Sequence, residues 1–136
     1  MQALIFGDGP MGRALALALS ERGEAPPILG RPGPAGHPPE ALAAAEVAFE
    51  ASVGSAVLGN LEAAMAADCR ALVIATTGWS DQLAAVRAAL EAAGAAAVWA
   101  ANFSLGTALF GRLVDEAAAL YGHVESFDPF IVEWHR

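Results

Sequence analysis

The chain has 136 residues, a length that suits one domain with at most a small addition. Its apolar fraction of 56% excludes a disordered chain, and a net charge of −8 with no basic run argues against binding nucleic acid. Because no stretch approaches 18 uninterrupted apolar residues and the first residues lack the features of a signal peptide, we expect no membrane span and a cytoplasmic protein.

Short apolar runs alternate with longer helical stretches along the chain. The sequence predicts strands at 3–6, 27–29, 47–49, 71–75 and 96–100, and helices at 11–22, 40–45, 55–67, 82–93 and 105–121. The segment 30–39 contains four prolines and three glycines, so it is predicted as a loop. Since uniformly apolar strands alternate with helices, we predict an α/β fold with a Rossmann-type, doubly wound parallel sheet.

The glycine-rich string G-D-G-P-M-G follows the first predicted strand directly and begins the first helix. In a dinucleotide-binding turn, Gly7 permits the tight bend, Gly9 lets a pyrophosphate approach the backbone, and Gly12 lets the helix pack on the strand. Pro10 and Met11 belong to the first helical turn, whose N–H groups point toward the phosphates. The alternative is a glycine-rich turn that binds nothing.

In dinucleotide-binding folds, the residue at the end of the second strand distinguishes the 2′-hydroxyl of NADH from the 2′-phosphate of NADPH. An acidic residue at this place favours NADH, but the sequence here is Leu29-Gly30-Arg31. Arg31 is suited to pair with a 2′-phosphate, which favours NADPH and leaves NADH as a second cofactor. The alternative is an arginine in a solvated loop.

Two further loops follow the fourth and fifth predicted strands, at the edge where open α/β sheets bind ligands. They comprise Thr76, Thr77 and Gly78 in the first loop, and Asn102, Phe103 and Ser104 in the second. Their hydroxyl, amide and backbone groups can hold a carboxamide, so a nicotinamide is expected between the two loops. As an alternative, Thr77 and Ser104 only cap the helices that follow.

Other polar residues have simpler interpretations. Cys69 lies among alanines and leucines and is predicted to be a packed thiol. His37 and His123 are predicted to be surface residues and not ligands. Glu50 ends the third strand near the ligand edge, and a solvated carboxylate is the default interpretation.

The glycine turn, the two loops and the segment 133–136 together resemble the bacterial dihydrodipicolinate reductase family. The matching strings are G-P-M-G-R at 9–13, A-T-T-G at 75–78, A-N-F-S-L-G at 101–106 and E-W-H-R at 133–136. The family reduces 4-hydroxy-tetrahydrodipicolinate with NAD(P)H in diaminopimelate and lysine synthesis. The resemblance therefore implies an oxidoreductase, a cyclic imine of the dipicolinate type as substrate, and His135 as the proton donor.

The sequence also departs from this family. Pro10 stands where the family has an arginine, and Ala101 where it has a proline. The family's lysine and its substrate-binding loop would lie beyond Arg136, so we expect cofactor binding with weak or absent turnover from these residues. Two interpretations stay open, a non-catalytic NAD(P)-binding module and part of a longer reductase.

The character of the sequence changes after residue 122, where alanine-rich helices give way to bulky apolar residues that include Phe127, Phe130 and Trp134. We therefore predict an NAD(P)-binding domain over 1–122 and the first strand of a truncated substrate and oligomerisation domain over 123–136. An unpaired strand at 124–134 is a template for another chain, so a homodimer or homotetramer is expected.

Overall fold

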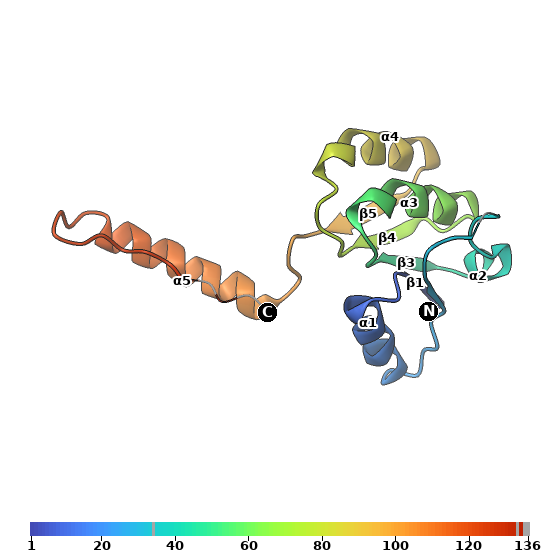
Figure 1. Cartoon of the computed structure of the whole chain (residues 1–136), viewed down its shortest axis with the longest axis horizontal. Coiled ribbons are helices and arrows are strands. Elements are labelled where there is room, and N and C mark those ends of the chain that lie inside the picture. The colour runs from blue at the N-terminus through green and yellow to red at the C-terminus, as the bar shows by residue number, and fades with distance from the viewer. Residues whose placement is uncertain (34, 133, 135–136) are drawn as a thin grey trace. The chain divides into compact units, whose positions relative to one another are not determined.

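The computed structural model describes residues 1–33, 35–132 and 134 (Figure 1). The chain falls into two compact units, Met1–Ala101 and Asn102–Arg136. The predicted boundary near residue 122 lies inside the second unit, just after its helix. Compactness and the change in sequence character thus divide the chain at different residues, and the assignment of 123–136 to a separate domain stays a prediction.

The first unit is built on a parallel sheet, as predicted. Among the described residues its strands are β1 (Ala3–Phe6), β2 (Ile28–Leu29), β3 (Val47–Glu50), β4 (Ala71–Ile74) and β5 (Ala96–Trp99). They lie in the order β2-β1-β3-β4-β5, and every neighbouring pair is parallel. The predicted fold class, an α/β domain of Rossmann type, is therefore confirmed.

Helices connect the strands in the way that parallel pairing requires. The helices of this unit are α1 (Pro10–Ser20), α2 (Pro39–Ala43), α3 (Val57–Ala66) and α4 (Leu83–Ala93), with single 3₁₀ turns at Gly54–Ala56 and Ser80–Gln82. Figure 1 shows α3 and α4 over one face of the sheet and α1 over the other. The helix predicted from residue 55 thus begins as a 3₁₀ turn and becomes α-helical at Val57.

The core lies between the sheet and α3. Strand register aligns Leu4 with Ala48 and Leu72, so these side chains share one face, and all three are buried. Val57 and Leu61 of α3 are fully buried in the same hydrophobic cluster. Small alanines on the strands let α3 approach the sheet closely, and the leucines fill the remaining space.

The second unit contains one long helix, α5 (Leu105–Tyr121), which matches its predicted bounds. Its N-terminus is capped by Ser104, whose Oγ accepts a hydrogen bond from the Thr107 N–H at 3.3 Å. After α5 the chain turns, and Tyr121 and Phe127 make an edge-to-face aromatic contact at 5.4 Å. Within the described part of 123–134 no strand is assigned, so the strand expected there stays a prediction that depends on a pairing partner.

In the described residues, every helix falls short of the length and apolarity that a membrane crossing requires.

Leu61→Ala should lower the free energy of unfolding by about 2–5 kcal/mol, because it leaves a cavity at a fully buried position of α3. Leu17→Ala on the exposed side of α1 is the matched control and should change stability by less than about 0.5 kcal/mol. Chemical denaturation measures both values. Equal losses in the two variants would contradict the assignment of the core to α3.

Candidate functional site

The chain reverses its direction across the sheet at β1. After β2 is added on one side of β1, β3 is added on the other side, and the remaining strands follow outward. In open α/β sheets such a reversal leaves a crevice at the carboxyl ends of the strands on either side of it. The loops after β1 and β3 therefore define the place where a ligand is expected.

The glycine turn after β1 has the geometry that its sequence predicted. Gly7 has a φ of +104°, and its N–H donates to the Leu29 carbonyl at 2.7 Å. A Cβ at Gly7 would overlap the Ala51 carbonyl, and a Cβ at Gly12 would overlap the Gly7 carbonyl. Gly9 differs from both, because a Cβ built there meets no atom within 4 Å. Two glycines thus serve the fold, whereas the third borders open space.

Helix α1 begins at this turn without a side chain that satisfies its first N–H groups. Gly9 is the N-cap residue and Pro10 is the first helical residue, followed by Met11 and Gly12. The turn is braced from the helix, because Arg13 Nε donates to the Asp8 carbonyl at 2.8 Å. The free N–H groups of a helix start, together with the helix dipole, form an anion-binding position.

A cavity of about 260 Å³ lies at the sheet reversal and brings the glycine turn together with the end of β2. Its lining comprises Gly7, Asp8, Gly9, Gly30, Arg31, Pro32, Ala51, Ser52, Val53, Ala56 and Asn60. Three of the residues that the sequence singled out, Gly7, Gly9 and Arg31, therefore face one space. Arg31 is exposed at this cavity.

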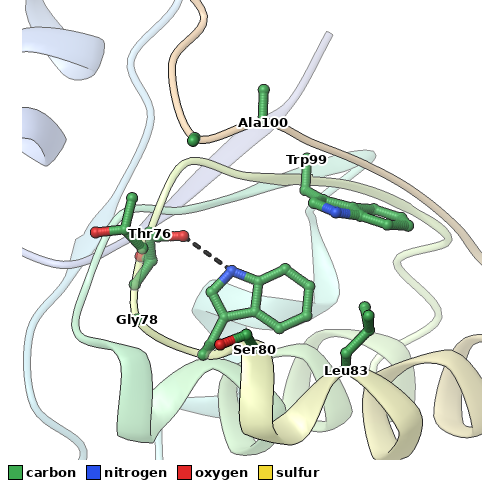
Figure 2. Close-up of a pocket in the computed structure, with 9 residues that line it drawn as sticks. Thr76, Gly78, Ser80, Leu83, Trp99 and Ala100 are labelled. Carbon is green, nitrogen blue, oxygen red and sulfur yellow. Dashed lines mark hydrogen bonds between the residues drawn. The ribbon is translucent and has the colours of Figure 1, made fainter.

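A second cavity, of about 210 Å³, lies farther along the same edge, after β4 and β5 (Figure 2). It is lined by Thr76, Thr77, Gly78, Trp79, Ser80, Leu83, Trp99, Ala100 and Ala101. Trp79 is buried, its Nε1 donates to the Thr76 carbonyl at 2.9 Å, and its ring meets Trp99 edge-on at 6.1 Å. The guanidinium of Arg87, on α4, lies 5.7 Å from the centre of the Trp99 ring, on β5. Two indoles thus line this cavity with apolar surface.

The two threonines of this loop have different surroundings. Thr76 is buried and its Oγ1 donates to the Glu50 carboxylate at 3.0 Å, whereas Thr77 is exposed at the cavity. The structure gives no capping hydrogen bond from Thr77 to the described helix starts that follow. Asn102, Phe103 and Ser104 belong to the second unit, where Ser104 caps α5 as the alternative interpretation predicted.

Glu50, at the carboxyl edge of the sheet, was predicted from the sequence to be a solvated carboxylate, and this prediction was wrong. Its carboxylate is fully buried and not solvated. Four donors reach it, namely the Ser52 N–H at 2.8 Å, the Ser52 hydroxyl, the Asn60 amide at 2.7 Å and the Thr76 hydroxyl at 3.0 Å. No Lys or Arg pairs with it within the described residues, so hydrogen bonds alone stabilise this carboxylate.

This buried carboxylate joins the two cavities. Ser52 and Asn60 line the first cavity, and Thr76 lines the second. The loops are also in direct backbone contact, since a Cβ at Gly54 would overlap the Gly78 carbonyl. The register of β3 places Glu50 beside Phe6 and Ile74 on the core face of the sheet, which the sequence alone did not show.

His37 extends this network, so its interpretation as a surface residue was wrong. The ring is half-buried, lies 5.1 Å from the Phe6 ring, and places Nε2 3.0 Å from Asn60 Oδ1. Since the Asn60 amide nitrogen donates to Glu50, the Asn60 oxygen accepts from His37. The proline-rich loop after β2 is thereby attached to α3.

Cys69 is a packed thiol, as predicted. It is buried, and burial raises the pKa of its thiol above the ordinary value, which keeps it protonated at neutral pH. A role as a reactive thiolate is therefore not supported.

The fold and this edge define the class of the protein: it is a nucleotide-binding domain of Rossmann type. Residues 35–103, just over half of the chain, match the family model described as dihydrodipicolinate reductase, N-terminus, and the chain belongs to this family. It is also 40% identical over 141 residues to a protein of Caulobacter vibrioides named 4-hydroxy-tetrahydrodipicolinate reductase. That alignment covers 98% of this chain and 54% of the relative, so the chain spans about half the relative's length.

The comparisons confirm the family that the loops indicated. The matched range includes the T-T-G loop and the start of the N-F-S loop. The proton donor implied by the resemblance, His135, lies outside the described residues together with Glu133 and Arg136.

Glu50→Ala should lower the free energy of unfolding by about 3 kcal/mol, because it leaves buried donors of Asn60 and Thr76 without an acceptor. Glu62→Ala on the exposed side of α3 is the control and should have little effect. Glu50→Gln should fall between them, since its amide presents a donor to groups that already donate. A Gln variant as stable as the parent would show that the carboxylate is dispensable.

Proposed function

We propose that this chain binds NADPH, with NADH as a second cofactor, across the carboxyl edge of its sheet. The observation that carries the proposal is the open space at Gly9, at the start of a helix whose N–H groups have no side-chain cap, with Arg31 lining the same cavity. A Cβ-free backbone at a helix start suits a pyrophosphate, and a guanidinium suits a 2′-phosphate.

The residues present fit a dinucleotide along this edge. The cavity at Gly7, Gly9 and Arg31 would hold the adenosine and phosphates, with Pro10, Met11 and Gly12 supplying the helix start. The second cavity would hold the nicotinamide, with Thr77 and Gly78 as its contacts and Thr76 positioning the loop through Glu50. The proposed cofactor contacts also include Asn102, Phe103 and Ser104, because the family carries the same N-F-S loop.

We further propose that the chain is the cofactor domain of an NAD(P)H-dependent reductase. The name of the Caulobacter vibrioides relative supports a cyclic imine of the dipicolinate type as the substrate. A bound nicotinamide would supply a hydride, and the chain's own groups would orient it beside the indoles of Trp79 and Trp99. His135 is the proposed proton donor by resemblance.

The setting of the protein is part of the same proposal. We place it in the cytoplasm, acting on a small molecule and not on nucleic acid, which its net charge of −8 disfavours. Phe127, Phe130, Ile131 and Val132 are exposed after α5, and such apolar side chains support a homodimer or homotetramer formed through 124–134.

Gly9→Val should abolish NADPH binding, because its branched side chain would fill the space left for the pyrophosphate. Binding is measured by the change in tryptophan fluorescence, since Trp79 and Trp99 line the second cavity. Stability should change by no more than about 1 kcal/mol, as no neighbouring atom is displaced. Gly59→Val on α3, outside the lining of either cavity, is the control; unimpaired binding by the Gly9 variant would exclude the turn as the site.

Arg31→Asp should weaken the binding of NADPH by roughly 1–3 kcal/mol more than the binding of NADH, because it removes a charged partner of the 2′-phosphate and adds a repulsive charge. Titration calorimetry with both cofactors measures the difference. Arg22→Asp makes the same charge change in the exposed turn after α1 and should affect neither cofactor. Equal losses for NADPH and NADH in the Arg31 variant would show that Arg31 does not contact the phosphate.

A further inference from the structure

The end of β2 lacks the acidic side chain that dinucleotide-binding folds place there. In such folds a carboxylate at this position accepts a hydrogen bond from the 2′-hydroxyl of the adenosine ribose. Here Leu29 ends β2 and Gly30 follows it, so no side chain projects from this position. Gly30 nevertheless lines the first cavity, beside Arg31.

The carboxylate of Asp8 occupies the space in front of Gly30. From the point where a Cβ of residue 30 would lie, Asp8 Oδ2 is 3.4 Å away, Cγ 3.5 Å and Oδ1 3.8 Å. An acidic side chain grown from the end of β2 would therefore enter the volume that Asp8 already fills. The glycine turn after β1 brings to this place the functional group that β2 omits.

The turn fixes the backbone of Asp8 beside Gly30. The Asp8 carbonyl accepts from Arg13 Nε at 2.8 Å, and the preceding Gly7 is fixed by its φ of +104° and its hydrogen bond to Leu29. Within the described residues, the Asp8 carboxylate has neither an ion pair nor a hydrogen bond, so its oxygens are available to a ligand. A carboxylate directed toward Gly30 repels a pyrophosphate at the helix start less than one that faces the helix start, because the two charges lie farther apart.

We propose that Asp8 determines cofactor specificity, by accepting the hydrogen bond of the adenosine 2′-hydroxyl in place of an acid on β2. This inference rests on the proposed binding of NAD(P)H. Asp8 and Arg31 line the same cavity with opposite charges. The carboxylate favours the ribose of NADH, the guanidinium favours the 2′-phosphate of NADPH, and their balance lets the chain accept both.

The first test is calorimetric titration of the full chain and of Asp8→Asn with NADH and NADPH. The variant should bind NADH about tenfold more weakly, because it loses a charge-assisted hydrogen bond. It should bind NADPH roughly fivefold more tightly, because a like charge near the 2′-phosphate is removed. The matched control is Asp81→Asn, at an exposed acid on the 3₁₀ turn Ser80–Gln82. It should leave the ratio of NADH affinity to NADPH affinity unchanged.

The second test removes the hydroxyl from the ligand. The parent chain should bind an NADH analogue without the adenosine 2′-hydroxyl about tenfold more weakly than NADH, whereas Asp8→Ala, which has no acceptor for that hydroxyl, should bind both alike. The third test moves the carboxylate to the residue that follows β2. The double variant Asp8→Ala with Gly30→Asp should recover the parent's ratio of NADH affinity to NADPH affinity, and Asp8→Ala with Gly30→Ala should not.

The outcomes separate this inference from the proposed function. If the parent binds neither cofactor, the proposed function is overturned and the inference with it. If the parent binds both but Asp8→Asn leaves the NADH-to-NADPH ratio unchanged, or the parent binds the deoxy analogue as well as NADH, only the role of Asp8 is overturned.

Discussion

The buried carboxylate of Glu50 is the constraint on which the ligand edge depends. Four hydrogen bonds reach it from the loop after β3 (Ser52), from α3 (Asn60) and from the loop after β4 (Thr76). An unpaired carboxylate inside a protein is strongly unfavourable, so these donors must stay in place whenever the domain is folded. The two cavities share this network, which fixes the distance between their loops. His37 adds the loop after β2 to the same network.

The other element of the site is the glycine turn, where backbone geometry and electrostatics act together. Gly7 and Gly12 allow α1 to start close to β1, and Gly9 keeps the helix start open. An acidic chain with a net charge of −8 binds a polyanionic cofactor most readily where local positive potential is supplied. The helix start and Arg31 supply it here. Asp8 and Arg31 line one cavity, so a single place on the edge can distinguish a hydroxyl from a phosphate.

Much of this site could be predicted from local sequence. The G-D-G-P-M-G string has a fixed relation to the strand and helix beside it, because the tight turn and close packing each require a glycine at a set spacing. The T-T-G and N-F-S loops follow strands whose apolar character is plain, and they indicated the family that the comparisons confirm. By contrast, Glu50 and His37 were interpreted as solvated, since a lone polar residue carries no local sign of the partners that reach it from distant parts of the chain.

The sequence by itself determined the alternation of strands and helices, the parallel sheet and the turn after β1, because these follow from hydrophobic periodicity and from the backbone preferences of glycine and proline. Only the tertiary structure decided which polar groups meet. The register of β3 turned Glu50 toward the core, α3 brought Asn60 to it, and the glycine turn directed Asp8 across Gly30. Such contacts join residues far apart in the chain, and their geometry is set by packing, which no local pattern encodes.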